Sequence, residues 1–85
     1  LADEVVPNEQ LHERALALAA ELARGALVAQ GLVKGAVDRG LGLPIADGLI
    51  FERHLFTEVF ATDDSRIGVA SFLEHGPGKA TFTGA

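Results

Sequence analysis

Residues 8–25, NEQLHERALALAAELARG, carry the clearest structural signal in this sequence. Asn8 suits a helix N-cap, and Gly25 is a typical residue just after the end of a helix. Between them, apolar residues recur at the three- and four-residue intervals that define one helix face: Leu11, Ala15, Leu18, Ala19 and Leu22. The stretch therefore predicts an amphipathic helix over residues 9–24.

Three further helices are expected downstream. Residues 27–39 are apolar on two sides, which predicts a helix that is buried on more than one face. The turn at 40–44 leads into a third helix that begins near Pro44 and carries an apolar stripe as far as Phe60. Thr62 or Asp63 can then cap a fourth, shorter helix, in which Asp63 and Asp64 favour the positive N-terminal end.

Two details refine this plan. Gly31 and Gly35 lie four residues apart, so they share one helix face on which another backbone could approach closely. Glu4-Val5-Val6-Pro7 resembles the end of a short strand, and no partner strand follows it. The expected fold is all-α, with about four helices after a short N-terminal strand stub. Residues 1–7 would end the last strand of a core outside this sequence, and residues 8–85 would form a helical subdomain.

Composition narrows the class of protein. The chain has 85 residues, a net charge of −5 and no Cys, so it is one domain or less, without disulfides or thiolate metal sites. An acidic chain is a poor general ligand for nucleic acid or anionic membranes. No apolar run is long enough for a transmembrane helix, and we expect a cytoplasmic protein. The absence of Met suggests that Leu1 is not the start of translation.

Local chemistry offers little support for an active site. Ser65, His54 and Asp63 do not form a hydrolase pattern, since Ser65 falls in the first turn of a helix rather than on a nucleophile elbow. His54 and Glu58 lie one helical turn apart, but two ligands do not make a metal site. We therefore expect no metal, and Asp63 and Asp64 are best explained by helix capping.

Two further patterns have structural explanations. The Gly40-Leu41-Gly42 segment follows a helix rather than a strand, so it is not a phosphate-binding loop. Phe56 and Phe60 recur at helical spacing, which makes core packing the default interpretation, although an exposed aromatic ring could also stack on a base.

The ordered series of motifs is similar to the C-terminal third of the enoyl-CoA hydratase/isomerase (crotonase) family. The run Lys34-Gly-Ala-Val-Asp-Arg-Gly-Leu41 resembles the family pattern K-x-x-[LV]-[ND]-x-[GA]. The stronger match is to the family ending LF…FATEDxxEGxxAFxEKRxPxFxG. It is carried by Leu55-Phe56, Phe60-Ala-Thr-Asp-Asp-Ser-Arg66, Gly68, Ala70, Phe72-Leu-Glu74, Pro77 and Phe82.

This resemblance implies a parent enzyme about three times longer that acts on acyl-CoA thioesters. The family's oxyanion-hole amides and catalytic glutamates lie in an N-terminal core, and none of them matches a residue of this chain. The resemblance therefore implies no catalytic residue here, an inactive chain when alone, and coenzyme A only as part of the parent enzyme's substrate. The parent would be a trimer or hexamer, with these helices covering the acyl pocket and forming subunit contacts.

The resemblance also assigns candidate binding residues. In the family, the adenine of coenzyme A is contacted by the Phe of LF, the Phe of AFxE and the Lys that follows. These positions correspond to Phe56, Phe72 and His75. His75 replaces the Lys, which weakens a phosphate or adenine contact at neutral pH. Ile67 replaces the family Glu in the EG pair.

Two classes of function stay open at this point. One is a fragment of an enoyl-CoA hydratase of fatty acid metabolism, and the other is a non-catalytic all-α interaction module. The sequence preceding Leu1 would discriminate between them, because an upstream oxyanion loop supports the first and an immediate start codon supports the second. The Arg-rich usage, five Arg against two Lys, points to a bacterial genome. With no core to cover, the apolar helix faces predict self-association of the chain.

Overall fold

The computed structural model describes residues 1–85 and contains helices only, with no strand. A short 3-10 segment, η1 (Asn8–Gln10), leads into α1 (Leu11–Ala23). The other helices are α2 (Leu27–Gly40), α3 (Ile45–Val59) and α4 (Asp63–His75). The all-α class is confirmed, and the helices fall close to the segments that the apolar periodicity indicated.

The N-terminal segment differs from the sequence-based expectation. Residues 1–7 form no strand, because a strand needs a hydrogen-bonded partner and this chain offers none. Instead, Glu4 pairs with Arg14, whose Nε lies 2.8 Å from Glu4 Oε1. The Asn8 side chain makes no cap hydrogen bond either. The Gln10 amide donates to the Pro7 carbonyl at 2.9 Å, so the first turn is tightened into a 3-10 turn that begins the helix without a side-chain cap.

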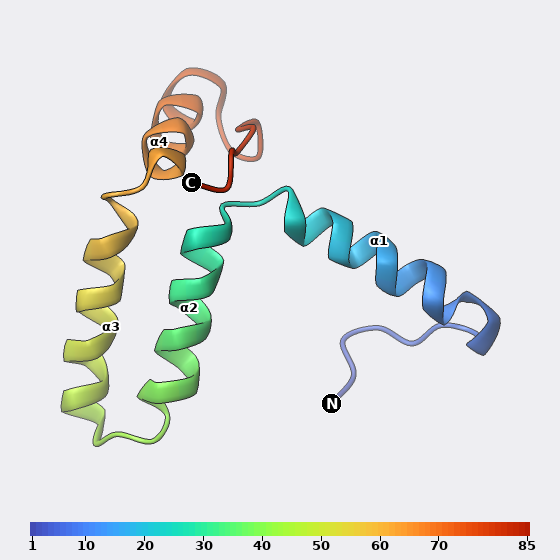
Figure 1. Cartoon of the computed structure of the whole chain (residues 1–85), viewed down its shortest axis with the longest axis horizontal. Coiled ribbons are helices and arrows are strands. Elements are labelled where there is room, and N and C mark those ends of the chain that lie inside the picture. The colour runs from blue at the N-terminus through green and yellow to red at the C-terminus, as the bar shows by residue number, and fades with distance from the viewer.

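The helices do not fold around a shared core. Figure 1 shows α2 and α3 side by side as an antiparallel hairpin, while α1 projects away from them and α4 lies beyond the end of α3. The radius of gyration is 16.0 Å, whereas a compact domain of this length would have about 12 Å. Only one residue, Asp64, is buried. The chain therefore presents most of its large apolar side chains to the surroundings.

Glycines allow α2 and α3 to approach where the hairpin closes. A Cβ added to Gly48 would lie 3.2 Å from the carbonyl oxygen of Gly40, which is tighter than ordinary packing. The predicted close approach at Gly31 and Gly35 is not found within the chain. No atom lies within 4 Å of a Cβ built on Gly31, and Gly35 meets only the Leu55 side chain, at 3.8 Å. The contact thus forms next to the turn, where the two helices are joined.

The fourth helix begins as its sequence indicates. Thr62 is the N-cap, and its Oγ1 accepts a hydrogen bond from the Ser65 amide at 3.1 Å. Gly76 ends the helix with a φ of 81°, a conformation that residues with a Cβ rarely adopt. The following residues turn back along α4, so the C-terminal tail lies beside the helix that precedes it (Figure 1).

Candidate functional site

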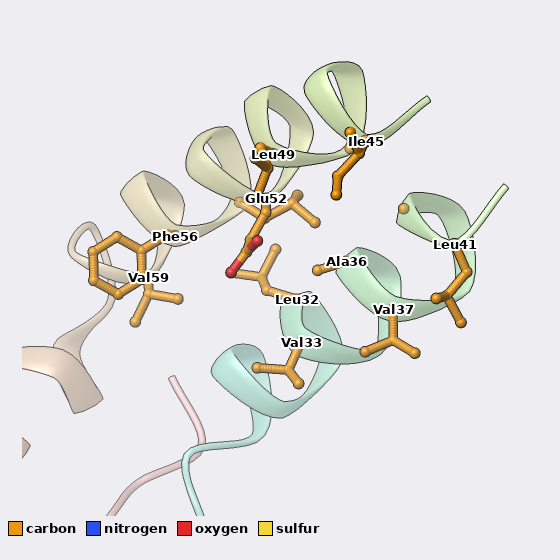
Figure 2. Close-up of a pocket in the computed structure, with 13 residues that line it drawn as sticks. Leu32, Val33, Ala36, Val37, Leu41, Ile45, Leu49, Glu52, Phe56 and Val59 are labelled. Atoms are coloured by element: carbon orange, nitrogen blue, oxygen red, sulfur yellow. The ribbon is translucent and has the colours of Figure 1, made fainter. Parts of the chain in front are cut away.

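An apolar groove lies between α2 and α3. It has a volume of about 440 Å³, and ten of the 13 residues that line it are hydrophobic. Figure 2 shows side chains of both helices along it, among them Leu32, Val33 and Val37 of α2 and Ile45, Leu49 and Phe56 of α3. Each helix carries apolar residues both on the face that contacts the other helix and on the outer face of the hairpin. The groove forms between these residues.

Glu52 is the one charged residue among those that line this groove. Its carboxylate points from α3 toward α2 in Figure 2, and it takes part in no salt bridge. In the sequence, Glu52 stands three residues after Leu49 and four before Phe56, which places it within the apolar stripe of α3.

Phe56 lies at the end of the groove near Val59 (Figure 2). Its side chain is 62% exposed, and its ring meets the Phe60 ring edge-on, with centroids 5.2 Å apart and an interplanar angle of 80°. The helical spacing favoured core packing of the two rings, but both are exposed in this chain. The two rings contact each other edge-to-face, and both remain more than half exposed.

A second, more polar hollow lies where the end of α1, α4 and the C-terminal tail meet. It has a volume of about 430 Å³. Phe72 lines it from α4, with Arg24 from the end of α1 and Lys79 from the tail. Phe82 lies against Gly68, where an added Cβ would be 3.4 Å from the Phe82 ring. The absence of a side chain at Gly68 therefore lets the tail form one wall of this hollow.

The buried carboxylate of Asp64 holds that tail in place. Its Oδ1 accepts from the Thr83 amide at 2.7 Å and from Thr83 Oγ1 at 2.9 Å, and its Oδ2 accepts from the Gly84 amide at 2.8 Å. The Asp64 amide in turn donates to the Ala85 carbonyl at 2.8 Å. Burial alone would raise the pKa of Asp64, but these hydrogen bonds outweigh it and bring the pKa below its ordinary value.

This arrangement corrects the prediction that both aspartates act as helix caps. Thr62 makes the cap hydrogen bond, Asp63 pairs with Arg66 on the surface, and the Asp64 carboxylate binds the tail. Both acids still lie in the first turn of α4, where a helix favours negative charge. The contact with Thr83 could not be read from the sequence, because 19 residues separate the two partners.

The three candidate binding residues do not converge in this chain. Phe56 lines the α2–α3 groove, and Phe72, which is 59% exposed, lines the second hollow. His75 is the last residue of α4 and lines neither of these two hollows, and its Nε2 lies 3.6 Å from Glu74 Oε2. No cluster of three or more His, Asp or Glu side chains is placed to hold a metal ion.

No single helix is both long and apolar enough to cross a bilayer. Residues Asn8–Ala23 and Leu27–Gly40 reach the required length and composition only when joined, and they are bent by 105° with respect to each other.

The chain is all-α, with an uncovered apolar groove and a C-terminal tail that is held by Asp64. In a comparison with protein families, the enoyl-CoA hydratase/isomerase family matches residues 1–84. The chain belongs to this family.

Individual relatives agree with this assignment. A probable enoyl-CoA hydratase of Rhizobium meliloti is 44% identical over 73 residues, which are 86% of this chain and 28% of the relative. A probable enoyl-CoA hydratase of Mycobacterium tuberculosis is 36% identical over 74 residues, 87% of this chain and 29% of the relative. The mitochondrial enoyl-CoA hydratase of Pongo abelii is 30% identical over 74 residues, 87% of this chain and 26% of the relative. The chain thus spans little more than a quarter of the length of these relatives.

Proposed function

We propose that this chain is the C-terminal helical portion of an enoyl-CoA hydratase, an enzyme that adds water to the double bond of a 2-enoyl-CoA. The observation that carries the proposal is the family match over residues 1–84, together with relatives that are named as enoyl-CoA hydratases. The parent enzyme would act in the cytoplasm of a bacterium, in fatty acid metabolism.

Within that enzyme the chain supplies surfaces rather than reacting groups. The uncovered α2–α3 groove and the exposed apolar face of α1 support a role in closing the acyl pocket and in contacts between subunits of a trimer or hexamer. The chemistry belongs to the remainder of the enzyme, where preorganised donors would stabilise the thioester enolate and glutamates would move protons. We therefore expect the chain alone to have no hydratase activity.

The same proposal gives Phe56, Phe72 and His75 a part in binding the adenine of coenzyme A, which enters as part of the substrate. Two features support it: the Phe56 and Phe72 rings are both more than half exposed, and each lines a concave surface. Stacking of a base on an aromatic ring contributes about 1–3 kcal/mol. His75 would contribute less than the Lys that the family carries there, because an imidazole replaces an ammonium group at the end of a long, flexible side chain.

A chimeric enzyme tests this function. The matching 73-residue segment of the Rhizobium meliloti relative is replaced by that of this chain, and hydration of a short 2-enoyl-CoA is followed by loss of its conjugated double bond. We expect an active chimera. Phe72→Ala should raise KM about tenfold, in line with the loss of one stacking contact, while kcat changes little. Leu73→Ala, at the neighbouring and 79% exposed position, is the matched control.

The alternative function, a non-catalytic all-α interaction module, makes a different prediction for the same experiment. A chimera that folds and assembles but does not hydrate the substrate would favour the module. Equal KM values for Phe72→Ala and Leu73→Ala would instead leave the hydratase function standing and remove Phe72 from the coenzyme A site.

A further inference from the structure

The C-terminal tail, residues 77–85, is attached to the rest of the chain through one residue. All four hydrogen bonds that the tail makes go to Asp64: three end on its carboxylate, and the Ala85 carbonyl accepts the fourth from the Asp64 amide. Asp64 is 2% exposed and takes part in no salt bridge. Its buried charge is therefore balanced by the Thr83 and Gly84 donors and by the positive N-terminal end of α4.

The tail lies along one face of α4 (Figure 1). Asp64, Gly68 and Phe72 follow one another at four-residue intervals, so they share this face. Thr83 is bound at Asp64, and the preceding residue of the tail, Phe82, lies against Gly68. The tail therefore runs back from the hollow that Phe72 lines to the start of the helix, where its end is fixed.

The tail supplies much of the lining of the Phe72 hollow. Six of the 12 residues that line the hollow come after α4 has ended. One of them, Lys79, is the only charged residue of the tail. Arg24 and Glu21 line the hollow from the end of α1. The hollow thus combines an aromatic ring with two cations and one acid, and half of its lining depends on where the tail is held.

The end of the tail also contacts the start of α2. A Cβ on Gly84 would lie 3.2 Å from Leu27 Cδ1. Leu27 begins α2 directly after the corner at residues 24–26, which carries Arg24 and the opposite wall of the hollow. The hydrogen bonds at Asp64 therefore hold the tail against both α4 and this corner. All of these contacts lie within the chain itself.

We infer that Asp64 is a positioning residue for coenzyme A binding: through Thr83 and Gly84 it fixes the tail that lines the Phe72 hollow. The inference rests on the coenzyme A role proposed above for Phe72. Eight residues of α4, about 12 Å of helix, separate Asp64 from Phe72, so Asp64 acts through the tail and not by contact with the substrate. Its effect belongs to the affinity for the substrate and not to the rate of the chemical step.

The test uses the chimera described above, built with residues 1–85 of this chain. Asp64→Asn keeps the shape of the side chain but removes its charge and one of its two acceptor atoms. We expect KM for the 2-enoyl-CoA to rise about threefold to tenfold, with kcat unchanged. Thr83→Val, which removes one hydrogen bond to Asp64, should raise KM less, and Thr83→Ser should keep the original value. Asp63→Asn, which alters only the exposed ion pair with Arg66, is the matched control.

A double variant tests whether Asp64 acts through the hollow. Asp64→Asn combined with Phe72→Ala should raise KM by less than the product of the two separate increases, because both changes affect one site. A purely structural role of Asp64 would instead lower the fraction of folded enzyme. The apparent kcat would then fall while KM stayed the same.

Two results would overturn the inference while the role of Phe72 stands. One is a KM that Asp64→Asn leaves unchanged although Phe72→Ala raises it, and the other is a double variant in which the two increases multiply. If Phe72→Ala leaves KM unchanged, the coenzyme A role of Phe72 fails, and the positioning role of Asp64 fails with it. The hydratase function is tested separately, by whether the unsubstituted chimera is active.

Discussion

Asp64 stands apart because it is an acid and yet is the one buried residue in an otherwise open chain. Its two carboxylate oxygens accept three hydrogen bonds from the tail, at lengths typical of charge-assisted bonds. The tail also meets the start of α2, where a Cβ on Gly84 would lie 3.2 Å from Leu27 Cδ1. One aspartate therefore connects α4, the tail and the neighbourhood of α2.

Removing the Asp64 charge should release the tail. In Asp64→Asn the amides of Thr83 and Gly84 lose an ionised acceptor, so we expect their hydrogen exchange to speed up while the centre of α4 keeps its protection. Asp63→Asn, which alters only an exposed ion pair with Arg66, should leave both amides unchanged. Unchanged protection in Asp64→Asn would show that the tail is held by other contacts.

The same group sets a pH dependence. The pKa of Asp64 is lower in the folded chain than in the unfolded chain, so its stabilising effect is complete above the unfolded value, about 4. The effect is lost as the pH falls through the lower, folded pKa. We expect tail protection to persist at neutral pH and to disappear in acid, below about pH 4. In Asp64→Asn this acid transition should be absent.

Thr62 offers a second test at the level of one residue. Its Oγ1 accepts from the Ser65 amide and donates to the Val59 carbonyl at 2.7 Å, so it joins the end of α3 to the start of α4. Thr62→Ala should reduce the free energy of unfolding by about 1 kcal/mol, the usual effect of a lost N-cap. Thr62→Ser should restore most of it. Urea titrations at one fixed protein concentration provide the comparison.

At the level of elements, Gly31 in α2 and Gly48 in α3 differ in what surrounds them. Nothing lies within 4 Å of a Cβ on Gly31, so Gly31→Ala should stabilise α2 by about 1 kcal/mol through helix propensity alone. Gly48→Ala gains the same propensity, but its Cβ presses on the Gly40 carbonyl and separates the helices. We expect no net gain there. Equal stabilisation in urea unfolding would mean that α2 and α3 adjust without cost.

Helix positions were predictable because apolar periodicity, Gly25, Thr62 and Gly76 are local signals that survive without a core. The predicted features that the structure of this chain does not show concern partners. The strand at residues 4–7 needs a partner strand, and this chain has none. The close approach at Gly31 needs the backbone of a neighbouring element, and none lies within 4 Å of a Cβ at this position. The hydrogen bonds from the Thr83 and Gly84 amides to the Asp64 carboxylate were missed for the same reason, because these groups meet only after the tail has turned back along α4.

For the whole molecule, the sequence already indicated a chain that cannot cover its own apolar surface, and the radius of gyration agrees with that indication. The family was also predictable, because its motifs occur in order along the chain. The sequence positions of Phe56, Phe72 and His75 did not show whether the three residues share one site. In the structure they lie on separate surfaces. A binding site that combines them would need surfaces from outside this chain.

The net charge of the chain gives the final prediction. Each copy carries a formal charge of −5, so two copies repel one another while their apolar faces attract. Repulsion between exposed charges reaches about 30 Å at 0.01 M salt and about 10 Å at 0.1 M, whereas apolar contacts are not weakened by added NaCl. The self-association expected for this chain should therefore tighten as NaCl is raised, and sedimentation equilibrium at several salt concentrations measures this. If association weakened instead, ion pairs rather than exposed apolar side chains would dominate the contacts between copies.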